Sequence, residues 1–329
     1  MIYSAGGNLL NQGADAQKSI AAFRKVDFSV CHEMFMTPSA RFCDVVLPAA
    51  SPLQKEDIGI PWAGNYLLYK PKILPYTGNE RSDYDIFCDL AGRLGVGNAF
   101  SEGRSEAQWI EYFIAHSAIT DPEEFRRSGI YLGEEQKRPG LHDFACEPGL
   151  FPLGTRSGKV ELGGHHESFL EDERSREDVA AGRRILFISP KVAERVHSQA
   201  GEHPDQRGIN RLGINPGTAE KFGFTDGQLV LVESRSGAMR IRLNFDISVM
   251  EDVVCAPEGT WLSGFGLLET GNIADSGSAN LLTSTEGSKE SVACIMHGIP
   301  VRVTPVKRTQ VPPQVPPPAQ ADRRSYLPD

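Results

Sequence analysis

The sequence of 329 residues predicts an α/β domain of parallel strands and helices, followed by a compact β-barrel or β-sandwich. Three observations favour this fold class. Short apolar runs alternate with helical segments in the first hundred residues, as in a parallel sheet buried on both faces. The stretch 171–184 is dense in charges and poor in apolar residues, which is typical of a domain boundary exposed to water. Beyond Ile185 the pattern becomes that of β-strands, with apolar residues at a period of two.

The first domain is expected to contain a strand, a helix and two further strands in that order. The patterns place these elements at 1–4, 14–25, 26–31 and 44–47. A second helix begins after Ser82, which is followed by Asp85 at the spacing of a capping residue, and Gly95 ends it. Weaker patterns between 96 and 180 predict an irregular connector, with helices at 106–115 and 122–127 and a strand at 159–162.

The second domain begins with an expected strand after Ile185. Asn215 is predicted to cap a short helix that has Pro216 in its first turn and ends at Gly223. Strands follow at 228–233, 239–245, 252–256 and 292–295, with a chain reversal at 234–237. The final Pro-rich segment is expected to be disordered or polyproline II. The predicted domains are therefore 1–180 and 181–308, with a tail at 309–329.

Composition and cysteine spacing exclude several classes of function. Lys and Arg number 34 against 43 Asp and Glu, so the net charge of −9 argues against nucleic acid as a partner. Neither an apolar run of ~18 residues nor an export signal is present, so we expect no membrane insertion and a cytoplasmic location for the chain as given. The six cysteines form no C-x-x-C pair, which predicts buried free thiols and neither a zinc site nor an iron–sulfur cluster within this chain.

Two local motifs resemble ligand sites without matching them. The segment Gly154–Lys159 is one residue shorter than a phosphate-binding P-loop, and Val160 occupies the position of the magnesium-binding hydroxyl. We interpret it as a turn before a strand. The pairs His32-Glu33 and His165-His166 have residue types that bind metals, but an isolated adjacent pair is more typical of solvated or cofactor-facing residues.

Polar residues also follow the predicted parallel strands at the points where these strands end. Asn8 follows the first strand, and His32 and Glu33 follow the second. Ligands of open α/β sheets bind at the carboxyl ends of strands. The carboxylate of Glu33 matches the paired N–H donors of a guanine edge, and Lys55 offers a positive charge for phosphate. These residues indicate a guanine nucleotide, but Asn8 as a plain turn residue and Glu33 as a helix-start carboxylate stay as the alternative.

A longer run of sequence adds a resemblance to a known family. The run 30–49, VCHEMFMTPSARFCDVVLPA, is preceded by Gly7-Asn8 and followed by QKED at 54–57. It resembles the late segment of molybdopterin oxidoreductases of the dimethyl-sulfoxide-reductase superfamily. Further matches follow in family order at 82–83, 155–161, 214–219 and 279–283, so the resemblance covers about residues 1–305.

The resemblance implies a fold and a cofactor. The expected fold is a partial α/β Rossmann-like three-layer domain, followed by a double-psi β-barrel domain that binds molybdopterin dinucleotide. The implied cofactor is bis(molybdopterin guanine dinucleotide), bis-MGD, with molybdenum or tungsten. The family contacts this cofactor at positions that match ten residues of this sequence: Asn8, His32, Glu33, Lys55 and Asp83 in the first domain, and Lys191, Arg195, His197, Trp261 and Asn280 in the second.

The resemblance also implies a function for the whole enzyme, which is two-electron or oxygen-atom transfer at molybdenum. Family members hold the metal ligand, and most of them also an iron–sulfur cluster, in an N-terminal part that has no counterpart here. We therefore expect the C-terminal, cofactor-orienting part of the catalytic subunit, not catalytically competent alone. Its expected partners are the missing N-terminal part or a separate catalytic chain, and an iron–sulfur electron-transfer subunit.

Two alternatives stay open at this point. The chain could instead be a non-catalytic molybdopterin-binding module or split subunit that serves a separate catalytic chain, or a barrel scaffold without cofactor. The segment 62–69 resembles the S-oxide and transhydroxylase branch of the family more than the formate dehydrogenases. If the full-length protein is exported, a periplasmic location is expected instead of a cytoplasmic one.

Overall fold

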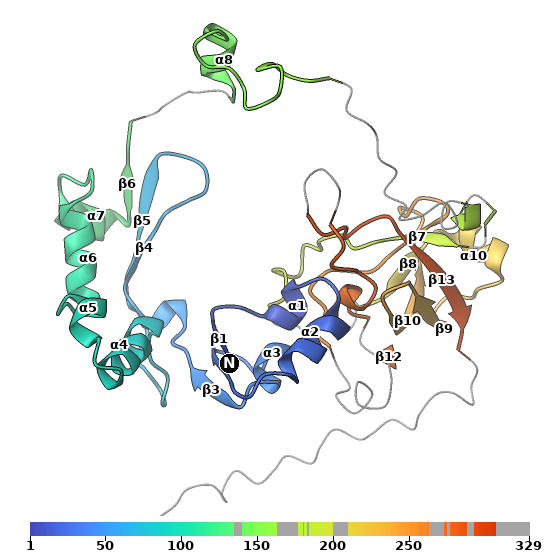
Figure 1. Ribbon diagram of the computed structural model, residues 1–329, viewed down its shortest axis with the longest axis horizontal. Helices are drawn as coiled ribbons and strands as arrows, with labels where there is room; N and C mark the ends of the chain where they lie inside the picture. Colours follow the sequence, from blue (N-terminus) through green and yellow to red (C-terminus); the bar gives the residue numbers. More distant parts are fainter. Residues whose placement is uncertain are drawn as a thin grey trace, which may run out of the picture. The chain divides into compact units, whose positions relative to one another are not determined.

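The computed structural model describes residues 1–134, 140–162, 177–179, 181–182, 184–199, 210–262, 273–274, 277–287 and 293–306 (Figure 1). The chain divides into two compact units. The first comprises Met1–Asn8 and Phe23–Ser168, and the second comprises Leu9–Ala22 and Phe169–Asp329. The segment Leu9–Ala22 thus leaves the first unit directly after its first strand. The tail 309–329 and His165-His166 lie outside the described residues.

The first unit contains a parallel sheet in the order β1-β2-β3. Its strands are β1 (Ile2–Ala5), β2 (Ser29–Glu33) and β3 (Val45–Pro48), which confirms the three strands predicted for this region. His32 lies opposite Ala5 of β1 and Leu47 of β3. The three strands therefore end at the same edge. Helix α3 (Pro38–Arg41) belongs to this unit, whereas α1 (Leu9–Gln12) and nearly all of α2 (Ala16–Phe23) belong to the second unit.

Asp44 fixes the start of β3 against the start of β2. Its carboxylate Oδ2 accepts hydrogen bonds from the Ser29 backbone N–H at 2.7 Å and from the Ser29 hydroxyl at 2.8 Å. These two bonds from Ser29 stabilise the charged form and lower the pKa of Asp44 below its usual 3.8.

The lowered pKa of Asp44 predicts a contribution to acid sensitivity. Because the folded-state pKa lies below the unfolded value, the stabilisation is fully present above about pH 4 and is lost as the pH falls through the folded pKa. Asp44→Asn should flatten the dependence of the unfolding free energy on pH below about pH 4, measured by urea unfolding. The exposed Asp27 supplies the control Asp27→Asn, and equal slopes for Asp44→Asn and the parent chain would contradict the assignment.

Four helices follow the parallel sheet, namely α4 (Asp83–Arg93), α5 (Gly97–Ser101), α6 (Glu106–Ala115) and α7 (Pro122–Ser128). The predicted cap of α4 is confirmed, since the Ser82 hydroxyl accepts a hydrogen bond from the backbone N–H of Asp85. The helix predicted at 106–115 has the predicted ends, and the one at 122–127 extends by one residue. Gly129, with φ +76°, terminates α7 in the left-handed region.

An antiparallel sheet that the sequence did not predict lies beside these helices (Figure 1). Its strands are β4 (Asp57–Gly59), β5 (Tyr66–Lys70) and β6 (Ile130–Leu132), with β5 in the middle. Side chains of the sheet pack on a small core from α6, α7 and the loop between them. That core consists of Ile110, Ile114, Ile119 and Phe125. Burial of this apolar surface holds the sheet and the helices together.

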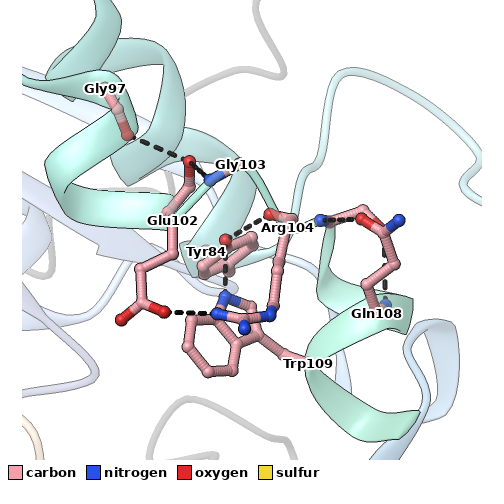
Figure 2. A network of polar contacts seen from close by, with 9 residues as sticks. Tyr84, Gly97, Glu102, Gly103, Arg104, Gln108 and Trp109 are labelled. Atoms are coloured by element: carbon pink, nitrogen blue, oxygen red, sulfur yellow. Dashed lines mark hydrogen bonds and ion pairs between the residues drawn. The ribbon is translucent and has the colours of Figure 1, made fainter. Parts of the chain in front are cut away.

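A cluster of three side chains connects helix α4 to helix α6 and to the loop that follows α5 (Figure 2). Its members are Tyr84 on α4, Arg104 in the loop and Trp109 on α6. The Tyr84 hydroxyl donates to the Arg104 carbonyl oxygen at 2.6 Å and accepts from the Trp109 indole N–H at 2.9 Å. The Arg104 guanidinium lies 4.6 Å from the Trp109 ring centroid and pairs with Glu102. Each side chain thus orients the next, and the cluster fixes α6 against α4.

The connector contains a short helix, α8 (His142–Cys146), and a turn. The Leu153 N–H donates to the Gly158 carbonyl, which confirms the turn predicted within Gly154–Lys159. The strand predicted at 159–162 is wrong. Val160 and Leu162 are exposed, so their alternation with charged residues reflects no sheet face. All six cysteines are free, but the prediction of burial is confirmed only for Cys31: Cys43, Cys88 and Cys255 are half-buried, and Cys146 and Cys294 are exposed.

Six strands of the second unit close into a barrel in the order β10-β8-β11-β7-β13-β9, with β9 pairing back to β10. Two of these pairings are parallel, β10 with β8 and β11 with β7, and the others are antiparallel. The strands are β7 (Ile185–Ile188), β8 (Leu212–Ile214), β9 (Leu229–Glu233), β10 (Ala238–Phe245), β11 (Val253–Cys255) and β13 (Ile299–Pro305), and β12 (Ile273–Ala274) pairs with β10 outside this ring.

Alternate residues of the barrel strands are fully buried, as their period of two predicts. Phe187, Leu212, Leu243 and Val254 all have 1% or less of their surface exposed. The predicted helix α10 (Pro216–Phe222) has Asn215 as its cap and ends at Gly223. Among the residues that the structure describes, no helix combines the length and the apolar character needed to cross a membrane.

One predicted strand of the barrel is wrong in position. Within 292–295, the described residues form no strand and only Cys294 forms an isolated bridge, to Gly287. The last barrel strand is instead β13. It contains Pro300 and Pro305, and proline disfavours a strand in a sequence-based interpretation because it cannot donate to the ladder.

Candidate functional site

The carboxyl edge of the parallel sheet brings together four of the predicted residues. Asn8 follows β1, His32 and Glu33 end β2, and Asp83 begins α4. Asn8 is buried, and its side-chain oxygen accepts a hydrogen bond from the Ser39 hydroxyl at 2.7 Å. This bond fixes the loop after β1 to α3.

His32 and Asp83 form a direct pair at this edge. The His32 ring is 2% exposed, and its Nδ1 lies 2.8 Å from Asp83 Oδ1. Its Nε2 lies 2.8 Å from the hydroxyl oxygen of Tyr3 on β1. Burial, and then the charge of Asp83, raise the pKa of Tyr3, so this phenol stays protonated and can donate to His32. The side chain of Asp83 is 42% exposed, so the buried imidazole orients a carboxylate that solvent or a ligand can reach.

Glu33 presents a second carboxylate at the end of β2. Its Oε1 accepts from the Met34 backbone N–H at 2.9 Å, and its Oε2 accepts from the Thr37 hydroxyl at 3.3 Å. Each carboxylate oxygen has two lone pairs, so both oxygens retain the capacity to accept another hydrogen bond. Glu33 is thus oriented by its own loop and can receive a pair of parallel N–H donors.

Lys55 lies in a different cavity, of about 320 Å³, whose lining includes neither Glu33 nor Asp83. Its ammonium is 3.9 Å from Asp57 Oδ2, and the cavity floor is formed by aromatic residues that include Tyr84 and Trp109. Burial, and then the charge of Asp85, raise the pKa of Glu106 in the same cavity. The structure therefore does not group Lys55 with the other predicted residues of this unit.

In the second unit, Arg195 is the centre of a buried polar network. It is 7% exposed, and burial lowers the pKa of its guanidinium. Its Nη1 donates to the Glu258 carbonyl oxygen at 2.8 Å and to the Thr260 hydroxyl at 2.9 Å. Its Nη2 donates to the Asn210 side-chain oxygen at 2.8 Å. Arg195 thereby ties the loop after β7 to the loop after β11.

The network extends to Trp261 and Asn280. The Trp261 indole N–H donates to the Ser198 carbonyl at 2.6 Å, and the Asn280 amide donates to the Asn11 carbonyl at 2.7 Å. The Asn11 amide in turn donates to the Thr260 carbonyl at 2.7 Å. The helical segment that contains Asn11 is therefore fixed to the barrel loops by predicted and unpredicted residues together.

Two predicted residues of the barrel are exposed. Lys191 lies on the surface of the loop after β7. His197 adopts a left-handed backbone with φ +48°, and its Nδ1 lies 2.9 Å from Glu258 Oε1. Gly259 lies directly against His197, since a methyl group on Gly259 would be 1.8 Å from the His197 carbonyl oxygen. The two loops thus meet backbone to backbone.

Sequence reasoning missed five members of this arrangement, which are Asn11, Asn210, Glu258, Gly259 and Thr260. No local motif marks them, because their roles depend on partners that lie far away in the chain. In the part of the chain that the structure describes, no three His, Cys, Asp or Glu side chains cluster as metal ligands would.

Two family models match the chain. The model of molybdopterin oxidoreductases matches residues 1–93, and that of the molybdopterin dinucleotide binding domain matches residues 185–300. Trimethylamine-N-oxide reductase of Haemophilus influenzae is 29% identical over 88% of this chain and 39% of its own length. Biotin sulfoxide reductase of Cereibacter sphaeroides is 28% identical over 92% of this chain and 44% of its own length.

A solved structure has the same fold. Acetylene hydratase from Pelobacter acetylenicus superposes with a TM-score of 0.75 at 22% identity, over 93% of this chain and 44% of that one. The chain thus spans about two fifths of the length of the curated relatives it matches.

Proposed function

Because the chain belongs to the molybdopterin oxidoreductase family, we propose that it is the C-terminal, cofactor-binding part of an enzyme that reduces an S-oxide or N-oxide. In this proposal the chain binds bis(molybdopterin guanine dinucleotide) and orients it. The names of the two relatives support the substrate class.

The observation that carries the proposal is the pair of oriented carboxylates, Glu33 and Asp83, at the carboxyl edge of the parallel sheet. A Rossmann-like interpretation of this sheet makes that edge the place where a nucleotide binds. A guanine edge has two adjacent N–H donors, and a fixed carboxylate with free lone pairs is their natural acceptor. The carboxylate acceptors of this edge fit the N–H donors of a guanine nucleotide.

The barrel offers the complementary set of donors. Its closed ring of mixed parallel and antiparallel pairings supports the double-psi interpretation. Lys191 and His197 are exposed on the loop after β7, and the Ser189 hydroxyl, 5% exposed with its residue, has no hydrogen-bond partner among the described residues. Ammonium, imidazole and hydroxyl donors fit the oxygens of a diphosphate or a pterin. In the proposal, Arg195 orients the loop after β7 through its hydrogen bonds to Glu258 and Thr260 in the loop after β11.

When bound, the metal of the cofactor would supply two-electron chemistry that protein side chains cannot perform. In the proposal, this chain binds the cofactor and orients it. His32 orients the Asp83 carboxylate, and Arg195 fixes the loop after β7 to the loop after β11. The exposed Lys191 and His197 would bind the anionic cofactor. Each of these tasks depends on contacts that exist before the cofactor arrives, which reduces the entropy lost on binding.

The test is to co-express the full chain with the N-terminal part of the enzyme in cells that make the cofactor. We expect the purified complex to contain molybdenum or tungsten, measured by mass spectrometry, and GMP, released by acid. Glu33→Gln and Asp83→Asn should reduce the GMP content about tenfold or more, because each removes a charge-assisted hydrogen bond. Glu123→Gln, on the exposed face of α7, is the matched control.

A folded complex without metal and nucleotide would refute the proposal. The same preparation distinguishes the two hypotheses for the chain, a part of the catalytic subunit and a non-catalytic module. Reduction of trimethylamine N-oxide or biotin sulfoxide by the loaded complex supports the catalytic subunit. A loaded complex that supports no reduction, but transfers its cofactor to a second chain, supports the non-catalytic module.

A further inference from the structure

The outer wall of the barrel contains a cavity of about 510 Å³ that the cofactor residues do not line. It lies over four adjacent strands, in the order β10-β8-β11-β7. On β8 and β11, Leu212, Ile214 and Val254 are fully buried in the barrel interior. Their neighbours Gly213 and Cys255, which alternate with them, face the opposite side and line the cavity.

The floor of the cavity depends on the absence of a side chain at Gly213. A methyl group there would lie 2.8 Å from Cys255 Sγ and 3.3 Å from a methyl carbon of Val249. Only glycine fits this approach without a shift of its neighbours. Apolar side chains surround the floor, among them Ile188, Val192 and Val253. The hollow is therefore mostly apolar and built into the strands themselves.

Arg211, the residue directly before β8, supplies a positive charge to this apolar cavity. It is partly buried, and across the described ranges of the chain it forms no ion pair and no side-chain hydrogen bond. A guanidinium has five N–H donors in a planar fork that matches a carboxylate. The lining of the cavity thus combines apolar side chains with a partly exposed guanidinium that has no side-chain partner among the described residues.

One carboxylate, Asp246, also lines the cavity, and its own loop binds one of its two oxygens. Asp246 Oδ1 accepts from the Ser248 N–H at 2.8 Å and from the Ser248 hydroxyl at 2.6 Å. Among the described residues no ion pair joins Asp246 to Arg211, so the guanidinium is available to an external anion.

We propose that this cavity, the Arg211 cavity, binds a small amphipathic carboxylate, with the carboxylate on Arg211 and an aliphatic chain against Ile188, Val192 and Val253. Binding would remove apolar surface of the ligand from water and give the guanidinium its missing partner. The inference is independent of the proposed function, because it requires no cofactor and uses none of the predicted cofactor residues.

The test is a titration of the full chain, prepared with and without cofactor, with hexanoate and with hexylamine. We expect hexanoate to bind with a Kd near or below about 1 mM, measured by calorimetry, and hexylamine not to bind detectably. Arg211→Gln should weaken hexanoate binding about 10- to 100-fold, since a charge-assisted hydrogen bond is lost. Val253→Trp, which fills the apolar part without touching the charge, should weaken it as well.

Arg302→Gln is the matched control, because Arg302 is exposed on β13 of the same barrel and does not line the cavity. Absence of hexanoate binding up to about 10 mM, equal binding of hexylamine, or equal hexanoate binding by Arg211→Gln would each overturn the inference. The cofactor proposal can fail while hexanoate still binds, so the two failures are distinguishable.

Discussion

Replacing Gly259 by alanine is expected to destabilise the barrel unit by at least about 3 kcal/mol. Two effects add. Gly259 has φ +76°, where an L-residue with a side chain is strained by about 1 kcal/mol. The added methyl group would also lie 1.8 Å from the His197 carbonyl oxygen and 2.5 Å from its carbonyl carbon, so the loop after β7 must move. Urea unfolding followed by the fluorescence of Trp261, in a Trp62→Phe and Trp109→Phe background, measures the loss.

Gly227→Ala separates the two effects. Gly227 has φ +71°, but a methyl group there meets no atom within 4 Å. This variant should lose only the backbone strain, about 1 kcal/mol. If Gly259→Ala costs no more than Gly227→Ala, the close approach of the two loops is not what makes Gly259 necessary.

Replacing Arg195 by methionine is expected to cost about 3 kcal/mol of unfolding free energy. Methionine fills part of the volume but leaves the Glu258 carbonyl and the Thr260 hydroxyl without this donor, and it leaves the Asn210 amide oxygen with only the Thr260 hydroxyl. Buried acceptors that lose a charged donor are costly because water cannot replace it. The same loss should loosen the loops that carry His197 and Trp261 and reduce the cofactor content of the complex.

Arg195→Lys retains the charge but cannot span the three acceptors, so we expect a smaller loss of stability than for methionine. Arg302→Met, on the exposed face of β13, is the control and should change stability by less than about 0.5 kcal/mol. An Arg195→Met chain as stable as the Arg302→Met chain would show that the network contributes little.

Local chemistry decided which elements could be predicted. The caps at Ser82 and Asn215 were predicted because a capping side chain and its N–H partner lie within three residues of each other. The strands of the parallel sheet were predicted from continuous apolar runs. The sheet of β4, β5 and β6 was not, because β4 and β6 have three residues each and show no period. Strand β13 was not predicted because it contains Pro300 and Pro305, and proline cannot donate a hydrogen bond to a β-ladder.

The residues of the candidate site also differ in how far the local sequence could predict them. Asn8, His32 and Glu33 could be placed at one edge because strand ends are local features, whereas Asp83 was indicated only by the family resemblance. The resemblance indicated Arg195, Trp261 and Asn280, but the pairings of the barrel network could not be predicted, since partners such as Asn11 and Thr260 are separated by 249 positions. For Lys55 the local sequence was misleading. It predicted a phosphate-binding residue near Glu33, but the Lys55 side chain lies beside Asp57 in a cavity lined by aromatic residues.

The excursion of Leu9–Ala22 into the second unit has a consequence for biosynthesis. The Asp15 N–H donates to the Thr283 hydroxyl, so Asp15 meets this partner only after a further 268 residues have been translated. Such distant pairings slow folding and leave α1 and α2 without their barrel partners while the residues between Asp15 and Thr283 are made. The same threading means that no single proteolytic scission can release either unit whole.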